Sequence, residues 1–440
     1  FSSFFFNNTI FPKIKLHFLV VLFLDFPCQV ILVSSCFNLT FYFIFQFQEQ
    51  VKQVIVCHED TKGLFFQYIF VVHIFLTSVL AIFLTVRGII CAENTHHFQP
   101  KKWYLPILAS TACAGIISFT FQAFLFSQPS RAIRAAFWLS PFLNCAVGVL
   151  LISIGTVGSL VLGIACPISA VIQSLYSCWV NHRIEHAIRV VSIAIAFPPP
   201  HATAMTLLSV VMCVLYSSLL ISGIGGATAE KSWLDNLFIF LIILSLVWTM
   251  QVIKNIQQVT VSHIKYVQFS IGIGLDSKTI FLSTIRHSIG SICVGSILVP
   301  VVTIVRGSAR AISLVSGDVD EFMSSCTGCS SGIASCLVIY GYRWGFVHVG
   351  VYNKGIVQAS VDSWEIFRRV GIEQLINSDL TSSVCFFYGV AGGAICTLLG
   401  GSWAFIIHKS YATELSIYAF LIGYLMTRVT MAPAQASISP

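Results

Sequence analysis

Polar side chains gather in one stretch of an otherwise apolar chain, WTMQVIKNIQQVTVSHIKYVQF. Four of them follow i, i+3, i+7, i+10 spacing and share one face of a helix: Trp248, Gln251, Asn255 and Gln258. Polar groups at membrane depth are costly and often mark a substrate pathway. The pattern leaves two interpretations open. Either this face lines a wet cavity, or it belongs to an exposed helix end that emerges into the cytosol.

A second polar stretch, VDSWEIFRRVGIEQLI, predicts an amphipathic helix over about 360–376, with Asp362 or Ser360 capping its start and Gly371 in its middle. Glu365 and Arg369 are spaced to form an i,i+4 ion pair. A basic amphipathic helix between spans lies most naturally in the cytosolic interface, either as a surface brace or as a gate. The gate candidates are Trp364, Phe367, Arg368 and Arg369.

Other patterns predict no catalysis. Cys326 and Cys329 have CxxC spacing, but no second ligand pair lies near them. His182 and His186 match H-x-x-E-H without a recognisable third ligand, so a solvated helix is the preferred interpretation. No nucleophile elbow or P-loop is found. The sequence therefore predicts a protein that is not an enzyme, with no cofactor, no metal site and no nucleic-acid partner.

The elements that must position these residues follow from composition. Hydrophobic residues make up 56% of the 440 residues and charged residues only 9%, against about 25% charged residues in soluble domains. Apolar runs of about 20 residues suffice to cross a bilayer as helices. The fold class is all-α, a polytopic membrane helical bundle of about ten transmembrane helices. The predicted spans are 66–87, 103–126, two from 137–180, 202–226, 233–254, 287–305, 332–341, 382–404 and 411–428.

The tight turn Gly155-Thr156-Val157-Gly158 divides the 137–180 run. With the first span running outward, most of the 24 Lys and Arg residues fall on the cytosolic side. Three regions are expected: an unreliable N-terminal extension with one hydrophobic run (1–60), a transmembrane domain (61–430) and a short tail (431–440) that is expected to be truncated.

Several stretches resemble the choline transporter-like family, particularly its plant members. They include HHFQPKKWYLPILASTACAGIISF, SLVWTMQVIKNIQQVT, YRWGFVHVGVYNKGIVQASVDSWEIFRRVG and GGSWAFIIHKSYATELSIYAFLIGYLMTR, and together they cover roughly 66–430. The resemblance implies a ten-helix protein of the plasma membrane or an organelle, associated with choline uptake without ATP hydrolysis. The plasma membrane is the expected location.

Choline is a quaternary ammonium that cannot donate an N–H hydrogen bond, so aromatic faces should recognise it. On the spans that carry the resemblance, the candidates are Trp138, Trp248 and Trp403, with Tyr418 and Tyr424 as second choices. The resulting hypothesis is an alternating-access carrier for choline or a related organic cation, embedded in the lipid bilayer. The alternatives are a lipid-handling or trafficking protein, which a polar groove open to lipid would favour, and an inactive truncated product.

Overall fold

A computed structural model gives the fold for residues 59–95, 99–196, 201–229, 233–271, 277–297, 300, 342–371 and 380–438. Within these ranges, nine helices are long and apolar enough to cross a membrane. The predicted helical membrane bundle is therefore confirmed. Three predictions lie outside the described residues: nearly all of the 1–60 extension, the span at 332–341, and the CxxC pair at 326–329.

Most predicted spans are recovered as longer helices. They are α3 (Glu59–Thr95), α4 (Pro100–Ser127), α5 (Pro129–Ile154), α6 (Val157–Ala196), α7 (Ala202–Thr228), α8 (Trp233–Ile271), α16 (Thr381–Ile407) and α17 (Lys409–Thr430). The predicted division of the 137–180 run is confirmed, because Gly155 ends α5 with a left-handed φ of 75°. The predicted tail contains a further short helix, α18 (Ala432–Ala436), whose five residues are all buried.

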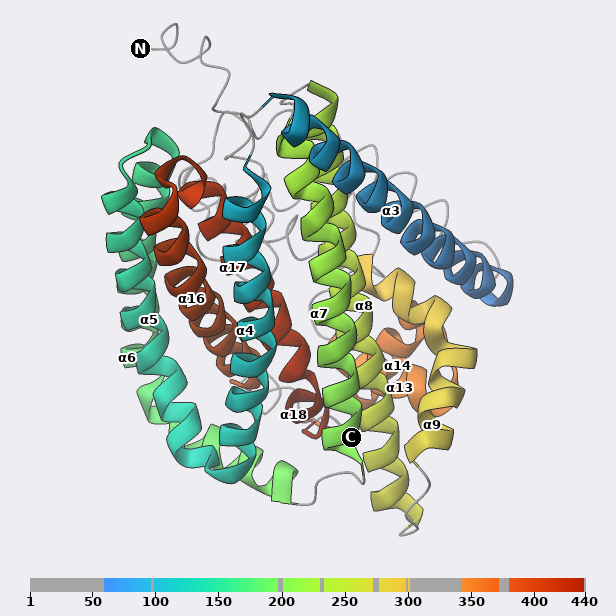
Figure 1. Ribbon diagram of the computed structural model, residues 1–440. Helices are drawn as coiled ribbons and strands as arrows, with labels where there is room; N and C mark the ends of the chain where they lie inside the picture. Colours follow the sequence, from blue (N-terminus) through green and yellow to red (C-terminus); the bar gives the residue numbers. More distant parts are fainter. Residues whose placement is uncertain are drawn as a thin grey trace, which may run out of the picture. The chain divides into compact units, whose positions relative to one another are not determined.

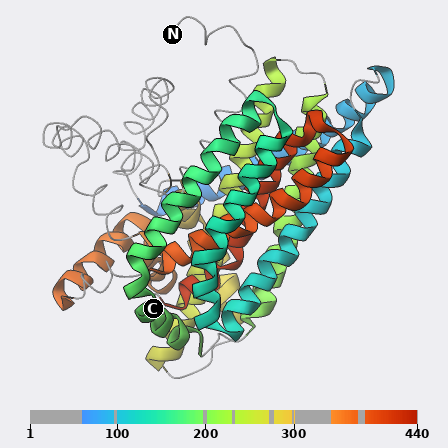
Figure 2. The same cartoon turned by 90° about the vertical axis from the view of Figure 1, so that its left-hand side faces the viewer.

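The described helices form two compact units. The first takes α3 from Val72 onward, α4 to α8, and α16 to α18. Within it, α16 packs along α17 and also contacts α4 and α5, while α17 contacts α4, α7 and α8 (Figures 1 and 2). The helix α8 is in turn contacted by α7, α17 and α18.

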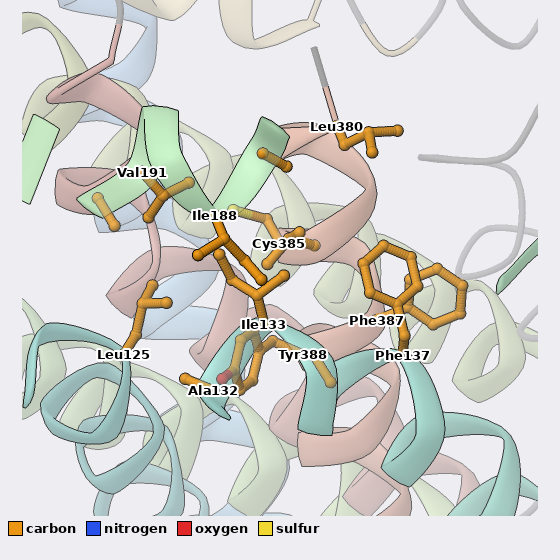
Figure 3. Packing of buried hydrophobic residues seen from close by; sticks show 14 of the residues in the cluster. Leu125, Ala132, Ile133, Phe137, Ile188, Val191, Leu380, Cys385, Phe387 and Tyr388 are labelled. Atoms are coloured by element: carbon orange, nitrogen blue, oxygen red, sulfur yellow. The ribbon is translucent and has the colours of Figure 1, made fainter. Parts of the chain in front are cut away.

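One apolar cluster of the first unit joins α4, α5, α6 and α16 (Figure 3). The rings of Phe137 and Phe387 lie against each other, with 4.8 Å between their centroids. Ile133 and Ile188 are buried beside them. Since lipid tails are as apolar as these side chains, close van der Waals packing rather than the hydrophobic effect holds such helices together.

The second unit contains α9 (Ser277–Ser283) from Lys278 onward, the π-helical turn η1 (Thr284–Ser288), α13 (Tyr342–Tyr352) and α14 (Ile356–Val370). The prediction for α14 was wrong at both ends. The helix begins after Gly355, and Gly371 ends it in the left-handed conformation (φ 73°) instead of lying in its middle. Neither proposed cap is used. Ser360 donates to Ile356 O, and Asp362 accepts from Lys354 and Gln358.

Candidate functional site

The polar face of α8 is buried. Gln251, Asn255 and Gln258 all lie within the packed part of the first unit. The interpretation of this segment as an exposed helix end is therefore wrong. α8 also continues as a helix to Ile271, well beyond the predicted end at 254. Helices α7, α17 and α18 pack against α8.

Gln257 is a further polar side chain of α8, and it lies outside the face predicted from the sequence. It is only 2% exposed, and among the described residues neither its amide oxygen nor its amide nitrogen has a hydrogen-bond partner. A buried polar group without a partner costs roughly 1–3 kcal/mol. Such a group is a candidate to bind something polar that enters the bundle. Only its place among other amides, in QVIKNIQQ, signals this in the sequence.

The aromatic member of the predicted face, Trp248, meets a side chain from α3. Its ring contacts that of His73, with 4.5 Å between centroids. A group of hydroxyls from α3, α7 and α8 lies close to this pair in the sequence of α3 and α8. Tyr216 of α7 shares a 2.8 Å hydrogen bond with Ser245 and accepts a longer one, of 3.4 Å, from Thr249.

The Tyr216 hydroxyl also lies 3.4 Å from Thr77 Oγ1 of α3. We call Thr77, Tyr216, Ser245 and Thr249 the Tyr216 cluster. It joins α3 to α7 and α8, two consecutive helices that follow more than 100 residues later in the sequence. The sequence reasoning missed it, because Tyr216 is a single polar ring inside an apolar run.

The other aromatic candidates are placed differently. Trp138 on α5 is 61% exposed and Trp403 on α16 is 40% exposed, so both rings face outward from their helices. Tyr418 and Tyr424 are buried on α17. Tyr418 lies 6.5 Å from the buried ring of Trp103, measured between centroids. Of the three tryptophans, Trp248 alone accompanies the buried amides of α8.

Charged groups also enter the first unit. Asp235 at the start of α8 is buried and pairs with Arg87 of α3, whose Nη2 donates to Asp235 Oδ1. Near the other end of α8, the buried Lys265 donates from Nζ to Ala194 O of α6 at 3.2 Å. By contrast, Glu185 of the H-x-x-E-H pattern pairs with Arg134 at 2.5 Å, and both side chains are exposed. That pair supports the preferred interpretation of this pattern as a solvated helix.

The gate candidates lie on α14 in the second unit. Arg368 and Arg369 are exposed, and the predicted pair of Glu365 with Arg369 is confirmed at 2.5 Å. Phe367 lies edge-to-face on Trp344 of α13, with 5.4 Å between centroids. Trp364 is partly buried.

Two ionisable groups between α13 and α14 have shifted pKa values. Lys354 donates to Asp362 at 2.6 Å and lowers the pKa of that carboxyl below 3.8; a hydrogen bond from Gln358 lowers it further, against the opposing effect of burial. Burial lowers the pKa of the His348 imidazole below 6.5, and the charge of Asp362 partly opposes that shift. The α13–α14 pair therefore holds a neutral histidine beside an ionised aspartate at neutral pH.

These helices and their buried polar side chains define a multi-pass α-helical membrane protein. The sequence profile of the plasma-membrane choline transporter family matches residues 164–439. The chain therefore belongs to that family, as its resemblance to the choline transporter-like proteins indicated. The matched region includes α7, α8 and α16 to α18, and with them Tyr216, Trp248 and Gln257.

Several fungal relatives are similar over part of their length. Protein PNS1 of Gibberella zeae is 26% identical over 164 residues, which is 35% of this chain and 30% of that protein. Protein PNS1 of Mycosarcoma maydis is 26% identical over 191 residues, 42% of this chain and 35% of that protein. For Protein PNS1 of Cryptococcus neoformans var. neoformans the identity is 25% over 218 residues, 45% and 39% of the two chains. The chain thus spans between 30% and 39% of the length of these curated relatives.

Proposed function

We propose that this protein carries choline or a related organic cation across the plasma membrane by alternating access, without ATP hydrolysis. The observation that carries the proposal is the match to the choline transporter family over the segment that contains the buried polar part of α8. The substrate path is proposed to follow Trp248, Gln251, Asn255 and Gln258, with Gln257 and the Tyr216 cluster added from the structure. Trp138 and Trp403 face outward and are left out of the path.

The chemistry of this path suits a quaternary ammonium. Such a cation offers no N–H donor, so it is held by aromatic faces and by carbonyl oxygens in a site from which water is excluded. Trp248 supplies an aromatic face, and the amides of α8 supply carbonyl oxygens. Lys265 is also buried on α8, near the C-terminal end of that helix, where its ammonium group would repel a cation. We therefore place the cation nearer Trp248 than Lys265.

Radiolabelled choline uptake into cells that express the full chain tests the proposal, with an empty-vector control and surface expression measured in parallel. Saturable uptake above the control is expected. A desolvated cation–π contact is worth about 1–2 kcal/mol, so Trp248→Ala should raise KM roughly 5- to 30-fold. Trp248→Phe should keep most of the affinity, and Trp138→Ala is the matched control on an outward-facing ring.

Two results would overturn the proposal. Absence of uptake by a chain that reaches the surface would remove the carrier function. Unchanged uptake in the Trp248→Ala, Gln251→Ala double variant would remove the proposed path. The structure does contain a groove on its membrane-facing side, but the groove is apolar. It therefore lacks the polar lining that would favour lipid handling.

The gate role of α14 is proposed on its composition, a short amphipathic helix with two exposed arginines in its last turn. Arg368→Cys places a thiol at an exposed position of this helix. A membrane-impermeant maleimide should label that thiol only after the cells are permeabilised. Labelling of intact cells would reverse the predicted orientation and place α14 outside.

A further inference from the structure

Four exposed arginines gather at one end of the hairpin that α5 and α6 form in the first unit. They are Arg131 and Arg134 in the first two turns of α5, and Arg183 and Arg189 on α6. The two helices pack along each other (Figure 1). Arg134 Nη2 donates to Glu185 Oε1 of α6 at 2.5 Å, so the arginines of both helices lie at the same end of the hairpin. We call these four residues the arginine cluster.

The lengths of the two helices place the arginine cluster at the edge of a membrane. From Arg134 to Ile154, α5 extends about 30 Å, and from Val157 to Trp179, α6 extends about 33 Å, at about 1.5 Å per residue. The hydrocarbon core of a bilayer is about 30 Å thick. When the turn between α5 and α6 lies at one edge of that core, the arginine cluster therefore lies at the other.

The exposed face of α6 changes its chemistry at this depth. Leu175 and Trp179, one turn apart, are 65% and 67% exposed. One turn further along, Arg183 places its guanidinium over the Trp179 ring, with 5.9 Å between Cζ and the ring centroid. An apolar face that ends in an exposed tryptophan and then an arginine is typical of a helix that passes from the hydrocarbon core into the headgroup layer.

The charges on the hairpin are strongly unbalanced. Glu185 is the only acidic residue in the sequences of α5 and α6, and it already pairs with Arg134. Four arginines against one glutamate give the two helices a net charge of +3, with histidines counted as neutral. Guanidinium groups bind phosphate through paired N–H donors, and basic groups beside a membrane attract its anionic lipids.

We propose that the arginine cluster binds the phosphate headgroups of anionic phospholipids in the leaflet that it faces. In the predicted orientation of the chain this is the cytosolic leaflet, which carries the anionic lipids of a plasma membrane. The proposal does not depend on choline transport, because none of the four arginines belongs to the proposed substrate path.

Native mass spectrometry of the full chain in a neutral detergent tests the binding. Dioctanoyl phosphatidylserine is compared with dioctanoyl phosphatidylcholine, which has the same acyl chains but no net charge. Phosphatidylserine should stay bound at concentrations at which phosphatidylcholine does not. The Arg183→Gln, Arg189→Gln double variant should bind phosphatidylserine roughly 10- to 30-fold more weakly, because each arginine near a membrane surface contributes a factor of about five.

Two double variants serve as matched controls. Lys101→Gln, Lys102→Gln removes two exposed positive charges from the first turn of α4. Since α4 ends immediately before α5 begins, that turn lies at the opposite membrane edge, and binding should match the wild type. Arg183→Lys, Arg189→Lys keeps both charges and should weaken binding only a few-fold. If the Gln variant of the cluster does not fold, Arg189→Gln replaces it, with an expected loss of about 5-fold.

Three outcomes would overturn the proposal. Equal binding of phosphatidylserine and phosphatidylcholine by the wild-type chain would show no preference for an anionic headgroup. Equal losses in the arginine and lysine Gln variants would mean attraction by the total charge of the chain. Displacement of phosphatidylserine by inorganic phosphate or by a polyglutamate peptide at the same concentration would make the cluster a site for free anions or acidic peptides instead of lipid.

Discussion

The ion pair between Arg87 and Asp235 predicts an asymmetric response to mutation. The two residues lie on α3 and α8, and they differ in burial. The Asp235 side chain is 1% exposed, whereas the Arg87 side chain is 27% exposed. Removing Arg87 leaves a buried carboxylate, but removing Asp235 leaves a guanidinium that can turn toward solvent.

The expected magnitudes follow from this difference. Breaking a buried pair by removing one partner costs about 3–5 kcal/mol, and a charged side chain at membrane depth costs about 2.5–3.5 kcal/mol. For Arg87→Gln we therefore expect a loss of about 3 kcal/mol in the free energy of unfolding, which would lower Tm by roughly 3 °C in a chain of 440 residues. For Asp235→Asn we expect about half of that loss, because Arg87 keeps access to water. The losses should be less than additive in the double variant.

Thermal unfolding of the purified full chain in one detergent, followed by tryptophan fluorescence, measures these differences. Arg134→Gln is the matched control. Its partner is Glu185, and the two side chains are 57% and 61% exposed, so its loss should stay below about 1 kcal/mol. The reasoning is refuted if Arg87→Gln unfolds at the wild-type temperature, or if Asp235→Asn is the more damaging of the two.

Three other predictions concern glycine packing, a buried amide and pH. Gly226→Ala should destabilise the first unit by about 1–3 kcal/mol, because the new Cβ would overlap backbone atoms of α3. Gly115→Ala should cost less, because its new Cβ would meet only valine methyl groups. Thermal unfolding of the two variants measures the difference. Gln257→Leu should raise the unfolding temperature, because it removes two buried polar atoms that have no partner among the described residues. The same variant should lower choline uptake if Gln257 lines the path. Raised stability with unchanged uptake would exclude this amide from the path. Because the folded pKa of Asp362 is depressed, its stabilising effect is present above the ordinary carboxyl pKa of about 4 and is lost as pH falls below it. Hydrogen exchange of the 342–371 peptides, corrected for the intrinsic effect of pH, should therefore accelerate on acidification in the wild-type protein. It should accelerate much less in Lys354→Met, which lacks the partner of Asp362. Equal acceleration in both proteins would contradict a stabilising role for the Lys354–Asp362 pair.

Local patterns were sufficient to predict the helices and some of their boundaries. Gly155 was predicted to divide a long apolar run, and it does so because only a residue that tolerates positive φ ends a helix in this way. The pair of Glu365 with Arg369 was predictable because both partners lie on one helix, a single turn apart. The start of α14 was not predictable in the same way. Its N-cap residue, Gly355, makes no side-chain hydrogen bond that a capping motif could reveal.

The sequence by itself determined that this chain is a helical membrane protein. In a bilayer, every backbone N–H and C=O must be hydrogen-bonded within the protein, and an apolar run of about 20 residues achieves this by itself as a helix. The tertiary structure decided which polar groups meet. Tyr216 bonds to Ser245, Arg87 pairs with Asp235, and Gln257 is buried with no hydrogen-bond partner in the described part of the chain. Those outcomes depend on which helices pack together, and hydrophobic periodicity along one helix carries no information about its neighbours.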